Sequence, residues 1–345
     1  MSALPKVTVC VPVRNGAFTI RRTLDSILAQ DYPNFEVIVS DNCSDDDTAS
    51  IVQEYAEQGV QYYFNPKLEE WGESNWNYIL SLAKGHFIAL YHSDDIYTPI
   101  MVSRQVEFLL NHPKASAVFT KTQTIDEFDR PIRNGLRRLP EELKDREEFD
   151  FPDLLNAVLK QGNFLTVPTM MARRESLDKA GSFDLKFCSA ADIDLWFKLS
   201  RLGTVGIIDE PLHKYRISEN QASAQLFKFR TYRSHFLQVM DHYLSIPEFR
   251  QLVKPQAFRY YEMYSVSDDI TRAMNMFFLG NVADARLLMK SALSRPEFRE
   301  GLRTKNFARP FLLSLPVFLA IQLGLRKLLY LLYEKHYKPW RQYGR

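Results

Sequence analysis

The strongest chemical signal in the sequence is an apolar run, residues 87–91, that ends in the letters HSDD at residues 92–95. Two adjacent carboxylates at the end of a buried strand repel each other unless a cation or a network of donors offsets their charge. Oxygen ligands beside an imidazole suit Mn²⁺ or Mg²⁺, which can hold a diphosphate and act on it as a Lewis acid. We therefore expect a metal site at Asp94, with His92 as a candidate second ligand. The alternative is a helix cap before residues 97–99, which would explain one of the two carboxylates.

A second acidic turn follows the strand-like run at residues 35–40. Within it, Ser44 and Asp47 have the spacing of a capping box, so most of this acidity has a structural explanation. Asp41 is different, because it lies at the end of the run and ahead of the expected cap. A carboxylate at that position can accept hydrogen bonds from the N–H group of a base or from ribose hydroxyls.

The third acidic feature is the pair Asp192 and Asp194, which opens an amphipathic helical pattern. Helix capping is the default explanation for this pair. If the helix has begun by residue 191, the two side chains point about 200° apart, so both do not easily serve one site. Asp192 falls on the apolar stripe of Leu195 and Trp196, and we expect it to face the protein interior. Asp194 lies four residues before Lys198, and an ion pair with this lysine accounts for it.

These acidic turns need a scaffold, and the alternation of β-branched runs with amphipathic stretches predicts one. The first run, residues 7–13, ends in Arg14 and Asn15 but lacks the G-x-G-x-x-G pattern of dinucleotide-binding folds. Alternating strands and helices imply right-handed crossovers and a mostly parallel sheet covered on both faces. Ligands of such sheets bind at the carboxyl ends of the strands, where the acidic turns lie. The predicted strands are 7–13, 35–40, 60–64, 86–91, 117–124, 164–172 and 204–208, and the predicted helices before residue 112 are 17–30, 47–58, 73–84 and 98–111.

The composition indicates a globular protein: the chain has 345 residues, 46% of them apolar and 25% charged. The net charge of +2 conceals an asymmetry, since residues 1–223 carry 24 basic against 33 acidic residues and residues 224–345 carry 20 against 9. An acidic body with a basic tail argues against nucleic acid as a partner and for an anionic surface facing the tail. Three scattered cysteines and an amino terminus without a signal-peptide pattern predict a cytoplasmic protein.

From residue 221 onward the strand signals vanish and helical patterns replace them. Residues 273–296 predict a helical hairpin that turns at Gly280. Residues 310–325 carry no charge, but the run is short for a spanning helix and is interrupted by Pro316. Its basic and aromatic flanks favour a helix lying in the interface of an anionic membrane, and a buried core helix or a dimer seam is the alternative. We expect three regions, residues 1–223, 224–300 and 301–345.

Taken in order, these features resemble the family 2 glycosyltransferases of GT-A fold. The resemblance covers about residues 5–223 and rests on the series VPVRN, VSDNCSD, Asn77 eight residues before Gly85, AKGHFIALYHSDD, GSFD, ADIDLWFKL and PLHKYR. It implies a Rossmann-like α/β domain of GT-A type, here followed by an all-helical region, and an inverting transfer of a sugar from a nucleotide diphosphate sugar to an acceptor hydroxyl. It also implies that Asp41 contacts the nucleotide base, Asp94 the metal and diphosphate, and that Asp192 is the general base. The donor-binding residues expected on this basis are Pro12, Val13, Arg14, Asn15, Asp41, Asn77, Ser93 and Asp94.

This chain departs from the family pattern at three places. His92 stands where the usual D-x-D motif begins, and Ala191 replaces the Glu of the usual Glu-Asp pair. Ser218 stands where members often place a histidine that can reach the metal, and His213 is a candidate substitute. The departures at residues 92 and 218 bear on the choice of metal, Mn²⁺ or Mg²⁺.

The sequence therefore predicts a peripheral enzyme on the inner face of the membrane that builds a cell-surface polysaccharide or a lipid-linked glycan. Its partners would be a nucleotide diphosphate sugar, a glycan or lipid-linked acceptor, and an anionic membrane surface bound through the tail. The alternative is a protein that binds nucleotide sugars without catalysis, with His92, Ala191 and Ser218 as signs of a degenerate site. A nucleotidyltransferase is less favoured, because the expected glycine- and lysine-rich phosphate loop is missing.

Overall fold

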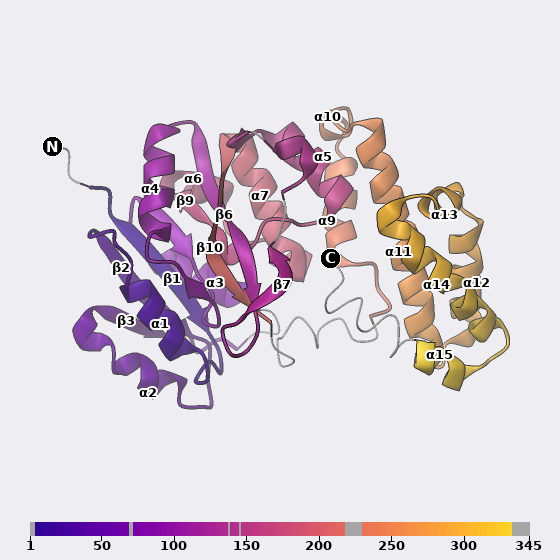
Figure 1. The fold of residues 1–345 in the computed structure, drawn as a ribbon, viewed down its shortest axis with the longest axis horizontal. Helices are drawn as coiled ribbons and strands as arrows, with labels where there is room; N and C mark the ends of the chain where they lie inside the picture. Colours follow the sequence, from indigo (N-terminus) through magenta and orange to yellow (C-terminus); the bar gives the residue numbers. More distant parts are fainter. Residues whose placement is uncertain (1–3, 69–71, 137–138, 145, 218–229, 333–345) are drawn as a thin grey trace. The chain divides into compact units, whose positions relative to one another are not determined.

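The chain divides into two units, an α/β unit, Met1–Ser218, and a helical unit, Glu219–Arg345, which the computed structural model shows in Figure 1. The structure describes residues 4–68, 72–136, 139–144, 146–217 and 230–332. Residue 223, where we expect the first boundary, and Ser218 lie outside the described residues. The boundary expected at residue 301 stays a prediction.

A ten-stranded sheet forms the centre of the α/β unit, in the part of the chain that the structure describes. Its strands are β1 (Val7–Val13), β2 (Phe35–Asp41), β3 (Val60–Phe64), β4 (Phe87–Leu90), β5 (Ile96–Tyr97), β6 (Ala115–Ile125), β7 (Pro131–Leu136), β8 (Glu148–Phe149), β9 (Met171–Arg173) and β10 (Thr204–Arg216). They lie in the order β3-β2-β1-β4-β9-β6-β10-β5, with β7 beside β6 and β8 beside β10. β1, β2, β3, β4, β6 and β10 run in one direction, and β5, β7, β8 and β9 run against them. The sheet is therefore mostly parallel, as predicted.

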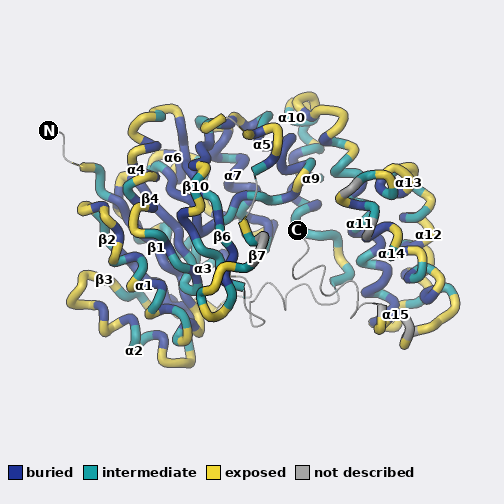
Figure 2. Tube along the Cα trace, viewed as in Figure 1, coloured by how far each residue is buried: buried dark blue, intermediate teal, exposed yellow. Residues whose placement is uncertain are grey.

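Helices cover this sheet, and the centre of the sheet is buried on both faces. All seven residues of β1 are buried, which is the pattern of a strand with helices on either side of it (Figure 2). The helices of the unit are α1 (Ile20–Leu28), α2 (Thr48–Gln53), α3 (Glu73–Leu82), α4 (Met101–Asn111), α5 (Phe151–Gln161), α6 (Arg174–Ala180) and α7 (Ala191–Leu202). The single turns of 3₁₀ helix are η1 (Ala56–Gln58), η2 (Glu141–Leu143) and η3 (Val167–Thr169), and the longer η4 spans Leu185–Ala190.

Two predicted strands differ from the observed ones by more than two residues at one end. The stretch 164–172 is a strand only from Met171, because η3 interrupts it at Pro168, which has no N–H group to give to a ladder. The stretch 204–208 continues as β10 to Arg216. The sequence patterns did not reveal α5 or α6, nor β5 and β8, which are only two residues long.

The helical unit confirms the expected change from strands to helices. Its helices are α9 (His235–Leu244), α10 (Pro247–Arg250), α11 (Pro255–Phe278), α12 (Val282–Ser294), α13 (Pro296–Gly301), α14 (Lys305–Gln322) and α15 (Arg326–Leu332). The predicted hairpin is present: α11 and α12 meet at Gly280, whose φ of 91° lies in the left-handed region that glycine enters at little cost. Pro296 ends this hairpin by starting α13.

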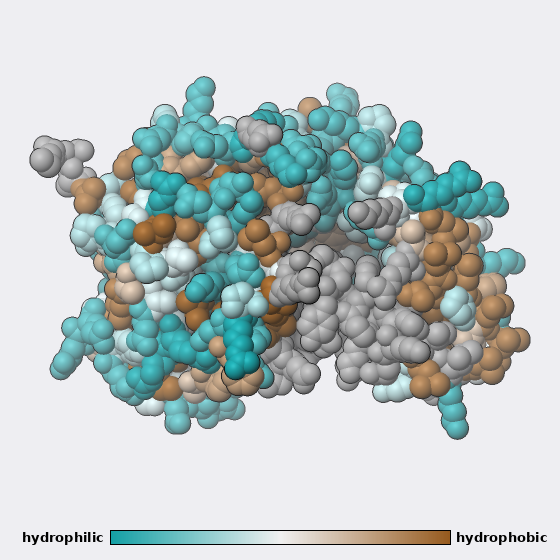
Figure 3. All heavy atoms as spheres, in the orientation of Figure 1, coloured by the Kyte–Doolittle hydropathy of each residue, from teal (hydrophilic) through white to brown (hydrophobic). Residues whose placement is uncertain are grey.

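Helix α14 has two apolar faces with different surroundings. One face, with Phe311, Val317 and Ile321, is buried in a core shared with α11 and α12. The other face carries Leu312, Leu315 and Leu319, and Leu323 continues their spacing at the residue that caps the helix; we call these four exposed leucines the leucine stripe. In Figure 3, hydrophobic side chains gather on this part of the helical unit. Pro316, expected to interrupt the run, lies inside the helix, which ends at Gln322. Among the described helices, none combines the length and the apolarity needed to cross a bilayer.

Candidate active site

The turn after β4 is held in a fixed shape by two tyrosines. The ring of Tyr91 stacks on that of Tyr97 with centroids 4.0 Å apart. The hydroxyl group of Tyr97 accepts a hydrogen bond from the N–H of His92 at 2.7 Å and donates one to its carbonyl at 3.1 Å. From α1, the hydroxyl of Thr23 reaches the carbonyls of Ser93 and Asp95 at 2.9 and 2.8 Å. The backbone that carries the acidic pair is thus fixed from two sides.

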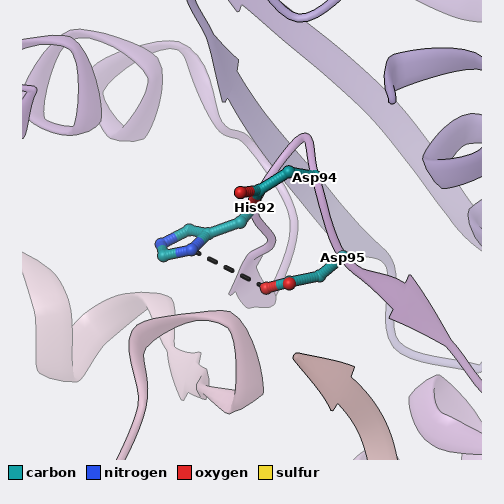
Figure 4. Close-up of side chains that lie close together, drawn as sticks. All are labelled: His92, Asp94 and Asp95. Carbon is teal, nitrogen blue, oxygen red and sulfur yellow. Dashed lines mark ion pairs between the residues drawn. The ribbon is translucent and has the colours of Figure 1, made fainter. Parts of the chain in front are cut away.

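His92, Asp94 and Asp95 come together at this turn, as Figure 4 shows. One potential ligand atom from each lies within 4.8 Å of the others, and the Nδ1 atom of His92 lies 3.8 Å from a carboxylate oxygen of Asp95. The Nε2 atom of His92 is buried without a hydrogen-bond partner among the described residues. Burial raises the pKa of the Asp94 carboxyl group, and the negative charge of Asp95 raises it further. A buried imidazole nitrogen and a carboxylate beside a second acid suit a divalent cation, so the residues present fit the metal site that the sequence predicts.

Asp95 has a structural role within this group. It is fully buried, and its Oδ2 atom lies 2.9 Å from Nε2 of His213, which is also fully buried. Its Oδ1 atom accepts a hydrogen bond from the backbone N–H of Arg216 at 2.9 Å, and the Arg216 guanidinium donates to the carbonyl of Asp94 at 2.7 Å. The helix cap considered for one carboxylate is therefore wrong: β5 follows the turn, and Ile100 precedes α4. Asp95 fixes the end of β10 against the turn, which leaves Asp94 and His92 as the more available ligands.

Asp41 lies at the carboxyl end of β2, as expected, but it is almost fully buried. Its carboxylate accepts hydrogen bonds from the N–H of Ser44 at 2.9 Å and from the hydroxyl of Tyr62 at 2.9 Å. The capping box is wrong, because α2 begins only at Thr48 and its N–H is bound by Asp46. The hydroxyl of Ser44 instead accepts the N–H of Asn15 at 2.8 Å, which joins the turns after β2 and β1.

The remaining residues that we expect to bind the sugar donor differ in their exposure to solvent. The side chains of Pro12 and Val13 are buried in β1, whereas Arg14 and Asn15 are exposed at its end. Asn15 has a φ of 51°, and its side-chain oxygen accepts the N–H of Asp45 at 3.0 Å. Because β2, β1 and β4 are neighbours in the sheet, the turns that carry Asp41, Arg14 and Asn15, and Ser93 and Asp94 lie at one edge.

The side-chain amide of Asn77 forms hydrogen bonds with the backbone of the protein. Its side chain donates to the carbonyl of Phe183 at 2.9 Å and accepts the N–H of the same residue at 2.8 Å. Both hydrogen-bonding groups of the amide therefore fix α3 to the segment that leads to α7. Its predicted contact with a donor stays a prediction.

Asp192 and Asp194 lie in the first turn of α7, which begins at Ala191 as the sequence argument required. The ion pair of Asp194 with Lys198 is present at 2.6 Å. The expected burial is reversed: Asp194 is 2% exposed, whereas Asp192 is only half-buried. Asp192 accepts a hydrogen bond from the side chain of Asn163 at 2.7 Å. A half-exposed and oriented carboxylate is accessible to a substrate, which the buried Asp194 is not.

Sequence reasoning missed three residues near these groups. Trp76 in α3 stacks on the imidazole of His92, with centroids 5.6 Å apart, and packs edge-on against Phe183 at 5.1 Å. Asn163, after α5, holds Asp192. Glu73, the first residue of α3, is 8% exposed. Burial raises its pKa to about 7, the charge of Asp192 adds to this rise, and a hydrogen bond from its own backbone opposes it. No local pattern marks these residues, since their partners lie far away in the sequence.

Comparison with known proteins identifies the family of this chain. The model of the family described as "Glycosyl transferase family 2" matches residues 8–181. An uncharacterised glycosyltransferase of Rickettsia typhi is 30% identical over 241 residues, which cover 68% of this chain and 72% of that protein. An uncharacterised glycosyltransferase of Methanocaldococcus jannaschii is 27% identical over 227 residues, 63% of this chain and 74% of that protein.

Solved structures share the fold at lower identity. S. aureus TarS 1-349 in complex with UDP has a TM-score of 0.51 and 18% identity, and the match covers 99% of this chain and 93% of that one. The mannosyltransferase PcManGT from Pyrobaculum calidifontis, in complex with GDP-Man and Mn²⁺, has a TM-score of 0.54 and 18% identity over 96% of this chain and 86% of that one. These matches confirm the predicted architecture, an α/β domain of GT-A type followed by a helical region. The family match over half of the sequence and the relative that is 30% identical also confirm the resemblance, and the chain belongs to glycosyl transferase family 2.

Proposed function

We propose that this glycosyltransferase catalyses an inverting transfer of a sugar from a nucleotide diphosphate sugar to an acceptor hydroxyl. The observation that carries the proposal is a series of aromatic contacts that joins the two halves of the site through Trp76. On one side its ring stacks on His92 of the predicted metal group. On the other it packs against Phe183, which in turn lies edge-on to Trp196 at 6.5 Å, one helical turn after Asp192. A general base and a metal group on two sides of one aromatic cluster suit an in-line displacement.

The side chains divide the chemistry between them. Asp192, oriented by Asn163, takes the proton of the acceptor hydroxyl as general base. Asp94 and His92 would hold Mn²⁺ or Mg²⁺, which when bound offsets the charge of the departing diphosphate. The exposed turn at Arg14 and Asn15 offers a cation and an amide to the donor at the same edge of the sheet.

Related structures support the choice of donor. TarS has been solved with UDP-GlcNAc and PcManGT with GDP-Man and Mn²⁺, and both share the fold of this chain. In this chain Asp41 is buried under Ser44 and Tyr62, and we propose that its turn receives the nucleotide base. The choice between uridine and guanosine nucleotides is therefore the first variable to test.

A thermal-shift assay with UDP-GlcNAc and GDP-Man, each with and without Mn²⁺, tests the donor site. We expect one of these donors to raise the melting temperature only when Mn²⁺ is present, and we expect Asp94→Ala to abolish this dependence. Asp178→Ala is the matched control, because the side chain of Asp178 is 67% exposed in α6. Donor binding that is unchanged in Asp94→Ala would contradict the metal assignment. Donor hydrolysis by the wild-type protein then separates an enzyme from a protein that only binds nucleotide sugars.

We further propose that the acceptor is a glycan or a lipid-linked glycan at the inner face of a membrane, within the synthesis of a cell-surface polysaccharide. The leucine stripe of α14 supports this, because four exposed leucines on one helix face form an apolar surface that an interfacial helix would insert. Arg303 and Lys327, both exposed, flank the helix and suit anionic headgroups. The predicted basic tail beyond residue 332 lies outside the described residues.

Co-sedimentation with liposomes that contain an anionic lipid tests this second part. We expect the full-length protein to sediment with them and the double variant Leu319→Glu, Leu323→Glu to remain largely in solution. Leu110→Glu, which changes a leucine 54% exposed in the α/β unit, is the control and should bind as the wild type does. Equal binding of the double variant and the wild type would show that the stripe does not contact lipid.

A further inference from the structure

Glu73 is a buried acid in an unusual place. It opens α3, is 8% exposed, and has no ion-pair partner among the described residues. Among the described residues, the charged group that acts on it is Asp192 of α7, a second acid. A buried carboxylate beside another carboxylate is unfavourable, so this arrangement calls for an explanation other than stability.

Aromatic packing joins the two helices that carry these acids. Phe183 lies between Trp76 of α3 and Trp196 of α7, at 5.1 and 6.5 Å. Glu73 is three residues before Trp76, and Asp192 is four residues before Trp196, so each acid lies one turn before the tryptophan of its own helix. Side chains in a helix lean toward its N-terminus, so both carboxyl groups are directed toward the starts of their helices.

The two acids differ in access. Asp192 is half-buried and is held by Asn163, whereas Glu73 is almost covered. A buried carboxyl group cannot reach an acceptor hydroxyl, but its charge can act on the carboxylate of Asp192, which can reach it. Glu73 is therefore suited to control the charge of Asp192 and not to replace it as the base.

We propose that Glu73 is a positioning residue for the transfer: the charge of its carboxyl group sets how strongly Asp192 attracts the acceptor's proton. This inference rests on the proposed function. In the transfer, the acceptor O–H bond breaks and its proton moves to Asp192, while the acceptor oxygen bonds to the anomeric carbon. The bond from that carbon to the diphosphate breaks, and the electron pair leaves with the diphosphate. When Glu73 is ionised, its negative charge stabilises the protonated form of Asp192, which makes Asp192 a stronger base.

The protonation of Glu73 gives this proposal a signature in pH. Since its pKa lies at about 7, Glu73 becomes ionised as the pH rises through neutrality. The rate of transfer should therefore rise over this range by more than the ionisation of a single base predicts. In Glu73→Gln this additional rise should be absent, because glutamine keeps the shape and the hydrogen-bonding capacity but carries no charge.

The test is the dependence of kcat/KM on pH for the wild type, Glu73→Gln and Glu73→Asp, with donor affinity measured in parallel. We expect Glu73→Gln to lose about three- to tenfold in kcat/KM at pH 8, to shift its acid limb to lower pH and to retain the donor affinity. Glu73→Asp should restore part of the rise. Glu175→Gln is the matched control, since Glu175 lies in the first turn of α6 and is exposed.

The outcomes separate this inference from the proposed function. An active wild type whose pH profile is unchanged in Glu73→Gln would overturn the role of Glu73 and leave the transfer in place. A wild type that neither transfers nor hydrolyses any nucleotide sugar would overturn both. A loss in Glu73→Gln that is equal at every pH would show only a structural role, and it too would refute the proposal.

Discussion

The raised pKa of Glu73 also leads to a prediction about protein stability, and this prediction does not depend on enzyme activity. An acid whose pKa is higher in the folded chain than in the unfolded chain takes up protons on folding, so folding is weakened as the pH rises from the lower value to the higher one. For Glu73 these values are 4.5 and about 7. The stability that Glu73 contributes is complete below pH 4.5 and is lost as the pH rises through 7.

The size of this effect follows from the shift. At 1.36 kcal/mol per unit of pKa, a rise from 4.5 to about 7 corresponds to about 3 kcal/mol between pH 4.5 and pH 8. Glu73 is 8% exposed, so screening by solvent takes away little of it. Glu73→Gln removes the titration, and the variant should therefore gain up to about 3 kcal/mol over the wild type as the pH is raised across this window.

Urea unfolding of both proteins at several pH values between 5 and 8 measures this gain. Tryptophan fluorescence is a suitable signal, because Trp76 and Trp196 both lie in the α/β unit. We expect the free energy of unfolding of Glu73→Gln to rise relative to that of the wild type with increasing pH. A difference between the two proteins that stays constant over this range would refute the reasoning, because Glu73 would then titrate as it does in the unfolded chain.

Three further changes test the site. Asp192→Asn should lose roughly 10²–10⁴-fold in turnover, the usual effect of removing a general base, with nearly unchanged donor affinity in a binding assay. Asp194→Asn should lower the free energy of unfolding by roughly 1–3 kcal/mol in urea, because it breaks the ion pair between the buried Asp194 and the partly exposed Lys198. An inactive but stable variant would instead identify Asp194 as the base. His92→Asp restores the common D-x-D motif and should bind Mn²⁺ as tightly or more tightly in a titration, whereas a tenfold loss would show that the imidazole has a specific role.

Sequence periodicity revealed the scaffold because the scaffold depends on local patterns. The runs at residues 7–13 and 60–64 coincide with β1 and β3. β1 is a buried parallel strand, which reads as a continuous apolar or β-branched stretch. β3 is mostly not buried, but it is rich in aromatic residues, which favour strands. The short β5 and β8 have no such pattern, because two residues show no periodicity. The ends of the strands could be located as well, and with them the turns that carry Asp41 and Asp94.

Side-chain partners could not be predicted in the same way. Asp95 pairs with His213, 118 residues away, and nothing near either residue in the sequence records that contact. The burial of the acids in α7 was reversed for a similar reason. An apolar stripe predicts which face of a helix is covered, but Asp194 is covered on another side, together with Phe197, which packs against Phe151 of α5. Since α5 itself was not predicted, that side was expected to be open.

Helix α14 combines two roles that are usually assigned to different segments. Its buried face completes the core of the helical unit, so the helix is already folded and its orientation is fixed by α11 and α12. The leucine stripe is therefore a rigid surface. Binding of an apolar partner would not have to offset the conformational entropy that is lost when a helix forms. The same connection means that removing residues from 301 onward would expose Met274, Phe277 and Met289, which pack in that core. A substitution on the stripe changes the surface alone, whereas a truncation changes the fold that carries it.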